Sequence, residues 1–172
     1  MRGRQTVRDM FLSMAVIGLV VGGIYIFIPH DENGDPVQAV DYRVELVTAR
    51  RAAPYPVAAP AGLPENWKPT SVSYERRNEN AWHLGYLDPD GQYIAVEQSS
   101  APAAKYVPEV SQQAADTGET QRIAGEDWQR WEGPKYDALV RTAGGATTVV
   151  TGTASYERLA EMVAALKAER AS

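Results

Sequence analysis

The feature that most constrains this chain is an uncharged apolar run near its N-terminus. Met10–Ile28 reads MFLSMAVIGLVVGGIYIFI, 19 residues without Asp, Glu, Lys or Arg. As a helix that rises about 1.5 Å per residue, it would span close to the ~30 Å hydrocarbon core of a bilayer. The sequence therefore predicts one transmembrane helix at 10–28, with a short head at 1–9 before it and a single domain after it.

Charged residues flank this run asymmetrically. Arginines dominate the head, whereas acids dominate the segment that follows, and no Lys or Arg occurs there before Arg43. Because basic residues stay on the cytoplasmic side, we expect a single-pass protein of the cell membrane with a cytoplasmic N-terminus and an extracytoplasmic C-terminal domain. A cleaved signal peptide has a shorter apolar region and a nearby small-residue cleavage site. The nearest tolerable site here follows Ala39, too far downstream, so we expect an uncleaved signal anchor.

Two glycines within the run have the spacing of a helix-packing motif. Gly18 and Gly22 form a GxxxG pair, which lets the backbones of two membrane helices approach closely. The sequence therefore allows a homodimer through this helix, although glycine is also common in membrane helices for other reasons.

The composition is that of one packed, exported domain. Hydrophobic residues make up 44% of the 172 residues, and there is no cysteine, so stability must come from a core rather than from disulfides. The net charge is −5, and the head contributes +2, which leaves −7 on the part after the anchor. That acidity argues against nucleic acid and against anionic lipid surfaces as partners.

Local patterns predict the order of elements after a polar linker at 29–39. Val40–Ala53 fits both a strand and a helix; its Ala- and Arg-rich end favours a helix, which we expect. Pro54, Pro56 and Pro60 end this helix, so 54–64 is expected to be an extended loop. Further helices are expected at Lys105–Ala115 and at Ser155–Ala168, where Ser155 is a good N-cap. The apolar stripe of the last helix consists of Leu159, Met162, Val163 and Leu166.

Short runs of strand character, separated by turn residues, fill the rest of the domain. The clearest pair, Trp82–Leu87 and Tyr93–Gln98, flanks the tight-turn sequence Asp88–Gly91. The sequence thus predicts an α+β domain at 40–172: an antiparallel sheet of about six or seven strands with packed helices, including a C-terminal one. The expected strands are 70–75, 82–87, 93–98, 120–123, 127–131, 136–142 and 147–151.

Several short motifs occur together along the chain. They are Val40–Tyr42, Ala53–Val57, Gly62–Pro64 with Trp67, Pro69–Ser71, Trp82–Tyr86, Glu97–Ser99, Gly125–Trp128 and Thr151–Ser155. In this combination the chain resembles the actinobacterial domain-of-unknown-function family 4245 over nearly its whole length. The resemblance implies a location in the envelope and supplies no catalytic residues. A looser similarity to RseB-like and PsbP-like exported modules, which are non-enzymatic, is one of fold alone.

Tryptophans are the main candidates for a binding surface. The domain after the anchor holds four of them and no phenylalanine. Trp128 and Trp131 lie three residues apart, so in a strand they face opposite sides. We expect one in the core and one on the surface, where it would bind a partner together with Trp82 and Tyr86. The alternative is that tryptophan simply replaces phenylalanine in the core.

Motifs for catalysis or metal binding are weak. Strand parity sets His83 opposite the face of Trp82, no Gly-x-Ser-x-Gly elbow surrounds Ser99 or Ser100, and Glu97 is expected to face water. The ligands of a zinc site are missing, so no metal or cofactor is expected. We predict a non-enzymatic binding or interaction module with an envelope protein as its partner. The alternative is a hydrolase of an envelope polymer that gathers Glu97 or His83 with a serine.

Overall fold

The computed structural model describes residues 5–27 and 38–171, with the side chains of the first stretch described over residues 10–23. The chain divides into two units, Met1–Pro36 and Val37–Ser172. Residues 1–4 of the predicted head, Ile28 of the predicted membrane segment and residues 29–37 of the predicted linker lie outside the described residues.

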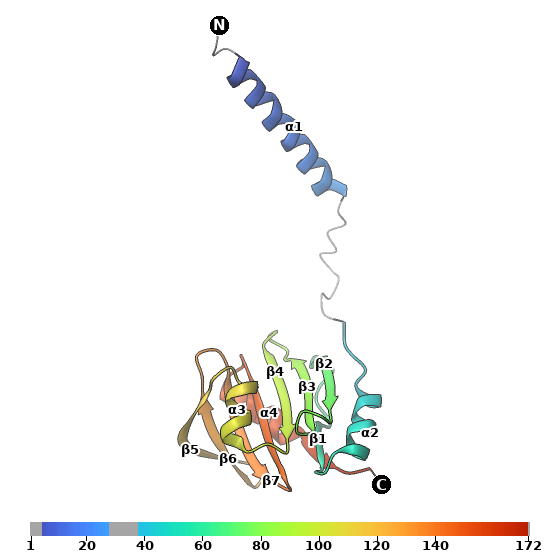
Figure 1. Ribbon diagram of the computed structural model, residues 1–172, viewed down its shortest axis with the longest axis vertical. Coiled ribbons are helices and arrows are strands. Elements are labelled where there is room, and N and C mark those ends of the chain that lie inside the picture. Colours follow the sequence, from blue (N-terminus) through green and yellow to red (C-terminus); the bar gives the residue numbers. More distant parts are fainter. Residues whose placement is uncertain (1–4, 28–37, 172) are drawn as a thin grey trace. The chain divides into compact units, whose positions relative to one another are not determined.

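The first unit contains helix α1 (Gln5–Phe27), which begins within the predicted head (Figure 1). Its large apolar side chains between Met10 and Val21 are 55–78% exposed. A Cβ added at Gly18 or Gly22 would meet no atom within 4 Å. Among the residues that the structure describes, no helix combines the length and the apolar character needed to cross a membrane.

The second unit is built on a seven-stranded antiparallel sheet, which confirms the predicted α+β class. The strand order is β2-β3-β4-β8-β7-β6-β5. Each predicted strand coincides with one of these, although β5 begins five residues earlier than expected. The strands are β2 (Lys68–Glu75), β3 (Ala81–Leu87), β4 (Tyr93–Ser99), β5 (Ala115–Ile123), β6 (Glu126–Glu132), β7 (Asp137–Ala143) and β8 (Ala146–Gly152).

Turn chemistry in the sequence explains two of the hairpins. Between β3 and β4, the Asp88 carboxylate accepts the backbone N–H groups of Asp90 (2.9 Å) and Gln92 (2.7 Å), which confirms its predicted role in the turn. Between β7 and β8, Gly144 and Gly145 both have positive φ, 63° and 83°. A two-residue hairpin turn of this kind requires that conformation, which glycine adopts without steric cost.

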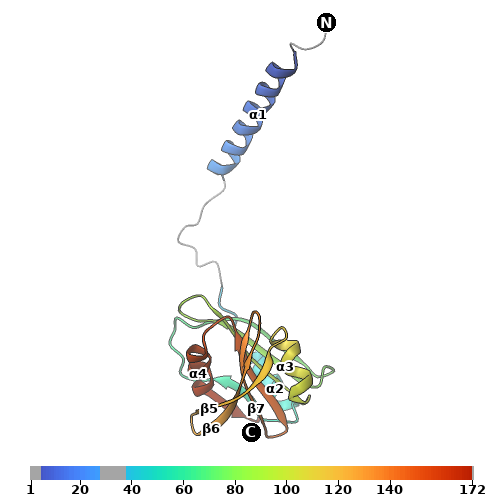
Figure 2. The same ribbon diagram turned by 90° about the vertical axis from the view of Figure 1, so that its left-hand side faces the viewer.

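Three helices pack in this unit, and Figure 2 shows α3 (Ala103–Val110) and α4 (Tyr156–Ala165) on opposite sides of the sheet. The segment 40–53 does contain a helix, α2 (Arg43–Ala52). Helix α3 ends earlier than predicted because Gln112 and Gln113 adopt positive φ, 55° and 78°, which no helix continues. At α4, the Ser155 hydroxyl accepts the N–H of Arg158 at 3.4 Å, as its predicted role as N-cap requires.

A second, two-stranded sheet corrects two sequence predictions. Strand β1 (Val57–Pro60) lies within the predicted loop 54–64, and β9 (Leu166–Glu169) replaces the end of the predicted C-terminal helix. The two pair antiparallel, with Val57 opposite Glu169 and Pro60 opposite Leu166. Val57, Ala58 and Ala59 are all buried, so an irregular loop here would leave their backbone N–H and C=O groups without hydrogen-bond partners. Pairing with β9 supplies those partners.

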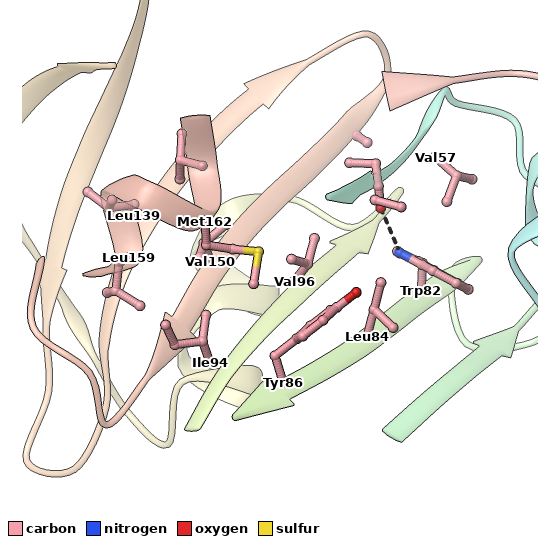
Figure 3. Packing of buried hydrophobic residues seen from close by; sticks show 14 of the residues in the cluster. Val57, Trp82, Leu84, Tyr86, Ile94, Val96, Leu139, Val150, Leu159 and Met162 are labelled. Atoms are coloured by element: carbon pink, nitrogen blue, oxygen red, sulfur yellow. Dashed lines mark hydrogen bonds between the residues drawn. The ribbon is translucent and has the colours of Figure 1, made fainter. Parts of the chain in front are cut away.

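The core consists of two clusters, one on each face of the seven-stranded sheet. The larger cluster lies on the α4 face, where Leu159 and Met162 pack against the strands (Figure 3). In the same cluster, the indole N–H of Trp82 donates to the carbonyl of Ala58 in β1 at 3.0 Å. The smaller cluster lies on the α3 face and contains Tyr106, Val107, Trp131, Val140 and Val149. The sheet is therefore covered on both sides, but less extensively by α3.

Candidate functional site

A line of hydrogen-bonded polar side chains crosses β2, β3 and β4 on the α3 face. Nδ1 of His83 lies 2.6 Å from Oε1 of Glu97, its direct neighbour across β3 and β4. Nε2 of His83 lies 2.7 Å from Oγ of Ser71. We call Ser71, His83 and Glu97 the Ser–His–Glu line. The His83 side chain is 26% exposed and that of Glu97 is 11% exposed, so the line runs from solvent toward the interior.

Strand register and one glycine bring these three residues together. Ser73 is paired with His83 and Ser71 with Gly85, so Ser71 reaches His83 diagonally. A Cβ at Gly85 would overlap the Ser71 hydroxyl and lie 3.1 Å from the Tyr93 hydroxyl. Glycine is thus required here for space, because the Ser71 side chain occupies the position above it.

The charge of Glu97 shapes the electrostatics of the line. Burial lowers the pKa of His83, but the hydrogen bond to Glu97 and its negative charge outweigh burial, and the pKa is raised above its ordinary value. The hydroxyl of Tyr106 in α3 donates to Oε2 of Glu97 at 3.3 Å. Burial, followed by the charge of Glu97, raises the pKa of Tyr93 to about 12. Burial also raises the pKa of Tyr106, so both tyrosines remain protonated donors at neutral pH.

Aromatic and cationic side chains lie beside the exposed end of the line. The ring of Tyr93 lies 6.0 Å from that of Tyr136, and Nζ of Lys135 lies 5.1 Å from the centroid of Tyr136. We call Tyr93, Lys135 and Tyr136 the aromatic rim. Tyr93 and Tyr136 are half-buried. The rim therefore adds a cation and two half-exposed rings to a surface whose other groups are hydrogen-bonding side chains.

The arrangement has definite acid–base capabilities. Glu97 accepts from Nδ1, which leaves Nε2 of a neutral imidazole free to accept the Ser71 hydroxyl proton. This is the order of groups by which a serine is activated as a nucleophile. The part of the chain that the structure describes contains no group of three His, Cys, Asp or Glu side chains placed to hold a metal ion.

All four residues that the sequence predicts for partner binding are buried in the structure. Trp128 and Trp131 do face opposite sides of the sheet, in different core clusters, but the prediction that one is exposed is wrong: they are 4% and 8% exposed. Strand β6 is covered on both faces, since the α3 cluster includes Trp131. Trp82 and Tyr86 lie in the larger cluster. An aromatic binding surface at these positions is therefore ruled out.

Sequence reasoning found two members of the Ser–His–Glu line and missed the third. His83 is partly exposed on the face opposite Trp82, as predicted, whereas Glu97 is buried by α3 rather than facing water. Ser99 instead donates to the carbonyl of Glu79 (3.0 Å) and is 1% exposed. The alternation in β2 sets Ser71 and Ser73 on one face, but only the β2–β3 register shows that they meet His83.

The fold and the line together define an α+β domain with a half-open polar surface on one face of its sheet. A protein-family model described as "Protein of unknown function (DUF4245)" matches residues 2–166, and the chain belongs to this family. The resemblance to family 4245 drawn from the motifs is thus confirmed. A comparison with curated proteins finds no match.

Proposed function

We propose that this chain is a single-pass, membrane-anchored binding module of the cell envelope, without catalytic activity. The anchor is the uncharged run at 10–28, followed by an acidic domain on the extracytoplasmic side. Exposure of the apolar side chains of α1 supports this assignment, because water is an unfavourable environment for a helix that is apolar on all sides. An actinobacterial envelope is the setting that the family resemblance implies, and the RseB-like or PsbP-like analogy agrees with a non-enzymatic role.

The half-open position of the Ser–His–Glu line is the observation that carries the binding role. A carboxylate and an imidazole on a sheet face cost desolvation that apolar side chains would not. Such groups suit a site that recognises a polar partner, and the aromatic rim beside them provides rings and a cation of the kind enriched in interfaces. The partner is an envelope protein that docks over this surface. A homodimer through Gly18 and Gly22 in the membrane helix would present two such docking surfaces.

Photo-crosslinking in the native membrane tests this location. A photo-reactive residue at Ser73, which is half-buried on the same face and paired with His83, should capture the partner. The matched control carries the same group at Glu157, which is exposed at the start of α4 on the other side of the sheet. Capture from both positions, or from 157 alone, would show that the partner does not dock at the Ser–His–Glu line.

Topology is tested separately from binding. Protease added to intact spheroplasts should remove the α+β domain and leave the N-terminal head protected, because the basic residues precede the apolar run. A C-terminus protected from protease in intact spheroplasts would refute the extracytoplasmic assignment.

A second candidate function is hydrolysis of an ester in an envelope polymer, which the distances of the Ser–His–Glu line favour. Nε2 of His83 would take the Ser71 proton as Oγ attacks the ester carbonyl, and would return it to the departing alcohol. Water would then release the acyl group from Ser71 by the same route. The Tyr93 hydroxyl beside Ser71 is a donor for the oxyanion that forms.

A serine-directed fluorophosphonate probe distinguishes the two candidates. The hydrolase requires labelling that disappears in Ser71→Ala and persists in Ser73→Ala, a serine two residues along the same strand. The binding module requires that no labelling depend on Ser71, while the crosslink from position 73 remains.

A further inference from the structure

Exposed apolar side chains of the second unit gather at one helix. Among its described residues, 38–171, the exposed large hydrophobic side chains are Val40, Val44 and Val47, which are 36%, 71% and 45% exposed. Val44 and Val47 lie in α2, and Val40 precedes it by three residues. Single exposed apolar residues are ordinary on a protein surface. Their concentration at one element, in the part of this unit that the structure describes, marks a patch.

Helix α2 has one face toward the core and one toward solvent. Leu46 and Ala49 pack on the larger core cluster, and Ala49 is fully buried. Val44, Val47 and Arg51 recur at intervals of three and four residues, so they lie together on the opposite face of the helix. We call Val44, Val47 and Arg51 the outer stripe of α2. Figure 1 shows this helix at the margin of the unit, next to β2.

The charge of the outer stripe differs in sign from that of the domain. The part of the chain after the anchor is acidic overall, which argues against anionic lipid as a partner of the domain at large. In α2, Arg50 is paired with Glu169 at 3.0 Å, and Arg43 lies 3.8 Å from Asp41. Arg51 is exposed and forms no ion pair with any residue that the structure describes. The stripe therefore ends in a cation that is available to an anionic partner.

The size of the patch favours a lipid surface over a protein as its occupant. The three valines expose on the order of 150 Å² of apolar surface, well below the roughly 800 Å² that each partner buries in a stable protein interface. A second copy of this chain would therefore gain too little area here. A lipid surface needs no matching shape, and apolar side chains beside a basic one are typical of helices that lie in the headgroup region.

The position of α2 in the sequence keeps it close to the anchor. Helix α1 ends at Phe27 and α2 begins at Arg43, so fifteen residues, 28–42, separate them. Whatever its conformation, this length of chain extends at most about 55 Å. With the anchor in the bilayer, binding of α2 to the same bilayer is intramolecular, so a weak affinity for lipid is sufficient.

We propose that the outer stripe of α2 docks on the extracytoplasmic leaflet of the membrane. Val44 and Val47 enter the headgroup region, and the guanidinium of Arg51 contacts lipid phosphate. This inference rests on the membrane anchor proposed above. Helix α2 packs on the larger core cluster, on the other face of the sheet from the Ser–His–Glu line. Docking through α2 therefore leaves that line open to a protein partner.

Fluorescence quenching by lipid in vesicles tests the proposal with the full-length chain. The chain has no cysteine, so a single introduced thiol carries the only label. Val44→Cys, labelled with the dye NBD, is reconstituted in phosphatidylcholine vesicles with about one-third phosphatidylglycerol. Lipid that carries a nitroxide near its headgroup should quench this label at least about twofold more than the same label in Glu45→Cys. Glu45 is the matched control because it is exposed on the same helix, roughly a third of a turn from the stripe.

Two variants test the side chains of the stripe in the chain labelled at position 44. Val47→Asp should reduce the ratio of docked to undocked chains at least about tenfold, and Arg51→Gln should reduce it about fivefold. Arg77→Gln removes the same charge from an exposed position between β2 and β3 and should have no effect. All three side chains are exposed, so the urea midpoint should stay unchanged in each variant.

The outcomes separate the docking from the anchor on which it rests. Equal quenching at positions 44 and 45, or quenching that persists in Val47→Asp, would overturn the docking. Quenching that vanishes when each vesicle holds a single chain would assign the stripe to a second copy and would also overturn it. Alkaline carbonate extraction of the vesicles tests the anchor: chains that are released refute both proposals, whereas chains that are retained but not quenched at position 44 refute the docking alone.

Discussion

Replacing Gly85 by alanine tests whether the Ser–His–Glu line depends on the space above that glycine. The new Cβ would overlap Oγ of Ser71 and lie 3.1 Å from the ring and hydroxyl of Tyr93. Alanine tolerates strand backbone, so the penalty is steric. Either Ser71 rotates away from His83 and loses a hydrogen bond, worth about 0.5–1.5 kcal/mol, or the strands shift to accommodate an overpacked side chain. We expect the free energy of unfolding to fall by about 1–3 kcal/mol.

A double-mutant cycle identifies the atom responsible. Ser71→Ala alone removes the bond to His83 and should cost about 1 kcal/mol. In Ser71→Ala/Gly85→Ala, the added Cβ has the room that Oγ occupied. The free energy of unfolding of the double variant should therefore be at least as high as that of the less stable single variant. The coupling energy between the two substitutions should be about 1–3 kcal/mol.

Urea unfolding followed by tryptophan fluorescence measures these energies in the full-length chain. All four tryptophans lie in the second unit, so the signal reports the α+β domain. If the two substitutions prove additive, or Gly85→Ala has no effect, then the steric account of the line is wrong.

Three further substitutions test the core and the electrostatics by the same unfolding assay. Met162→Ala should cost about 2–5 kcal/mol because Met162 is fully buried. Leu166→Ala should cost about 1 kcal/mol because Leu166 is only half-buried, in β9; equal losses would contradict the assignment of β9. The pKa of His83 is raised on folding. The stabilisation that protonated His83 gives the folded state should therefore be present below the unfolded pKa of about 6.5 and be lost as the pH rises through the folded pKa. The stability difference between wild type and His83→Gln should shrink accordingly, and a difference that grows with pH would refute the pairing with Glu97. Trp82→Phe should cost about 1–3 kcal/mol through the lost bond to Ala58, and a neutral effect would mean that this bond does not hold β1.

Local sequence patterns predicted the helices and strands that are specified by residues within or next to the element itself. The β3–β4 hairpin follows from alternation and from Asp88, and α4 follows from its apolar stripe and Ser155. The β1–β9 pair was not predictable in this way. Val57–Pro60 lies among prolines, and Leu166–Glu169 has helical composition, so only their mutual pairing makes them strands.

The candidate site was predictable to the same extent. Strand parity correctly sent His83 away from Trp82 and separated Trp128 from Trp131, because side-chain alternation is a local property. The position of Ser71 depends on the register between β2 and β3, and the burial of Glu97 and Trp131 depends on α3 packing over them. Neither is contained in the pattern of a single strand.

The β1–β9 pair also delays completion of the fold during synthesis of the chain. Next to that ladder, the Arg170 side chain bonds the carbonyl of Pro54, across 116 residues. At roughly 5–20 residues per second, the ribosome needs about 6–23 s to supply the second partner after the first. Until β9 is made, the buried side chains of β1, Val57 among them, lack the strand that pairs with them. The unfinished polypeptide therefore exposes apolar surface of the kind that chaperones bind, and a chain interrupted before residue 166 would keep it exposed.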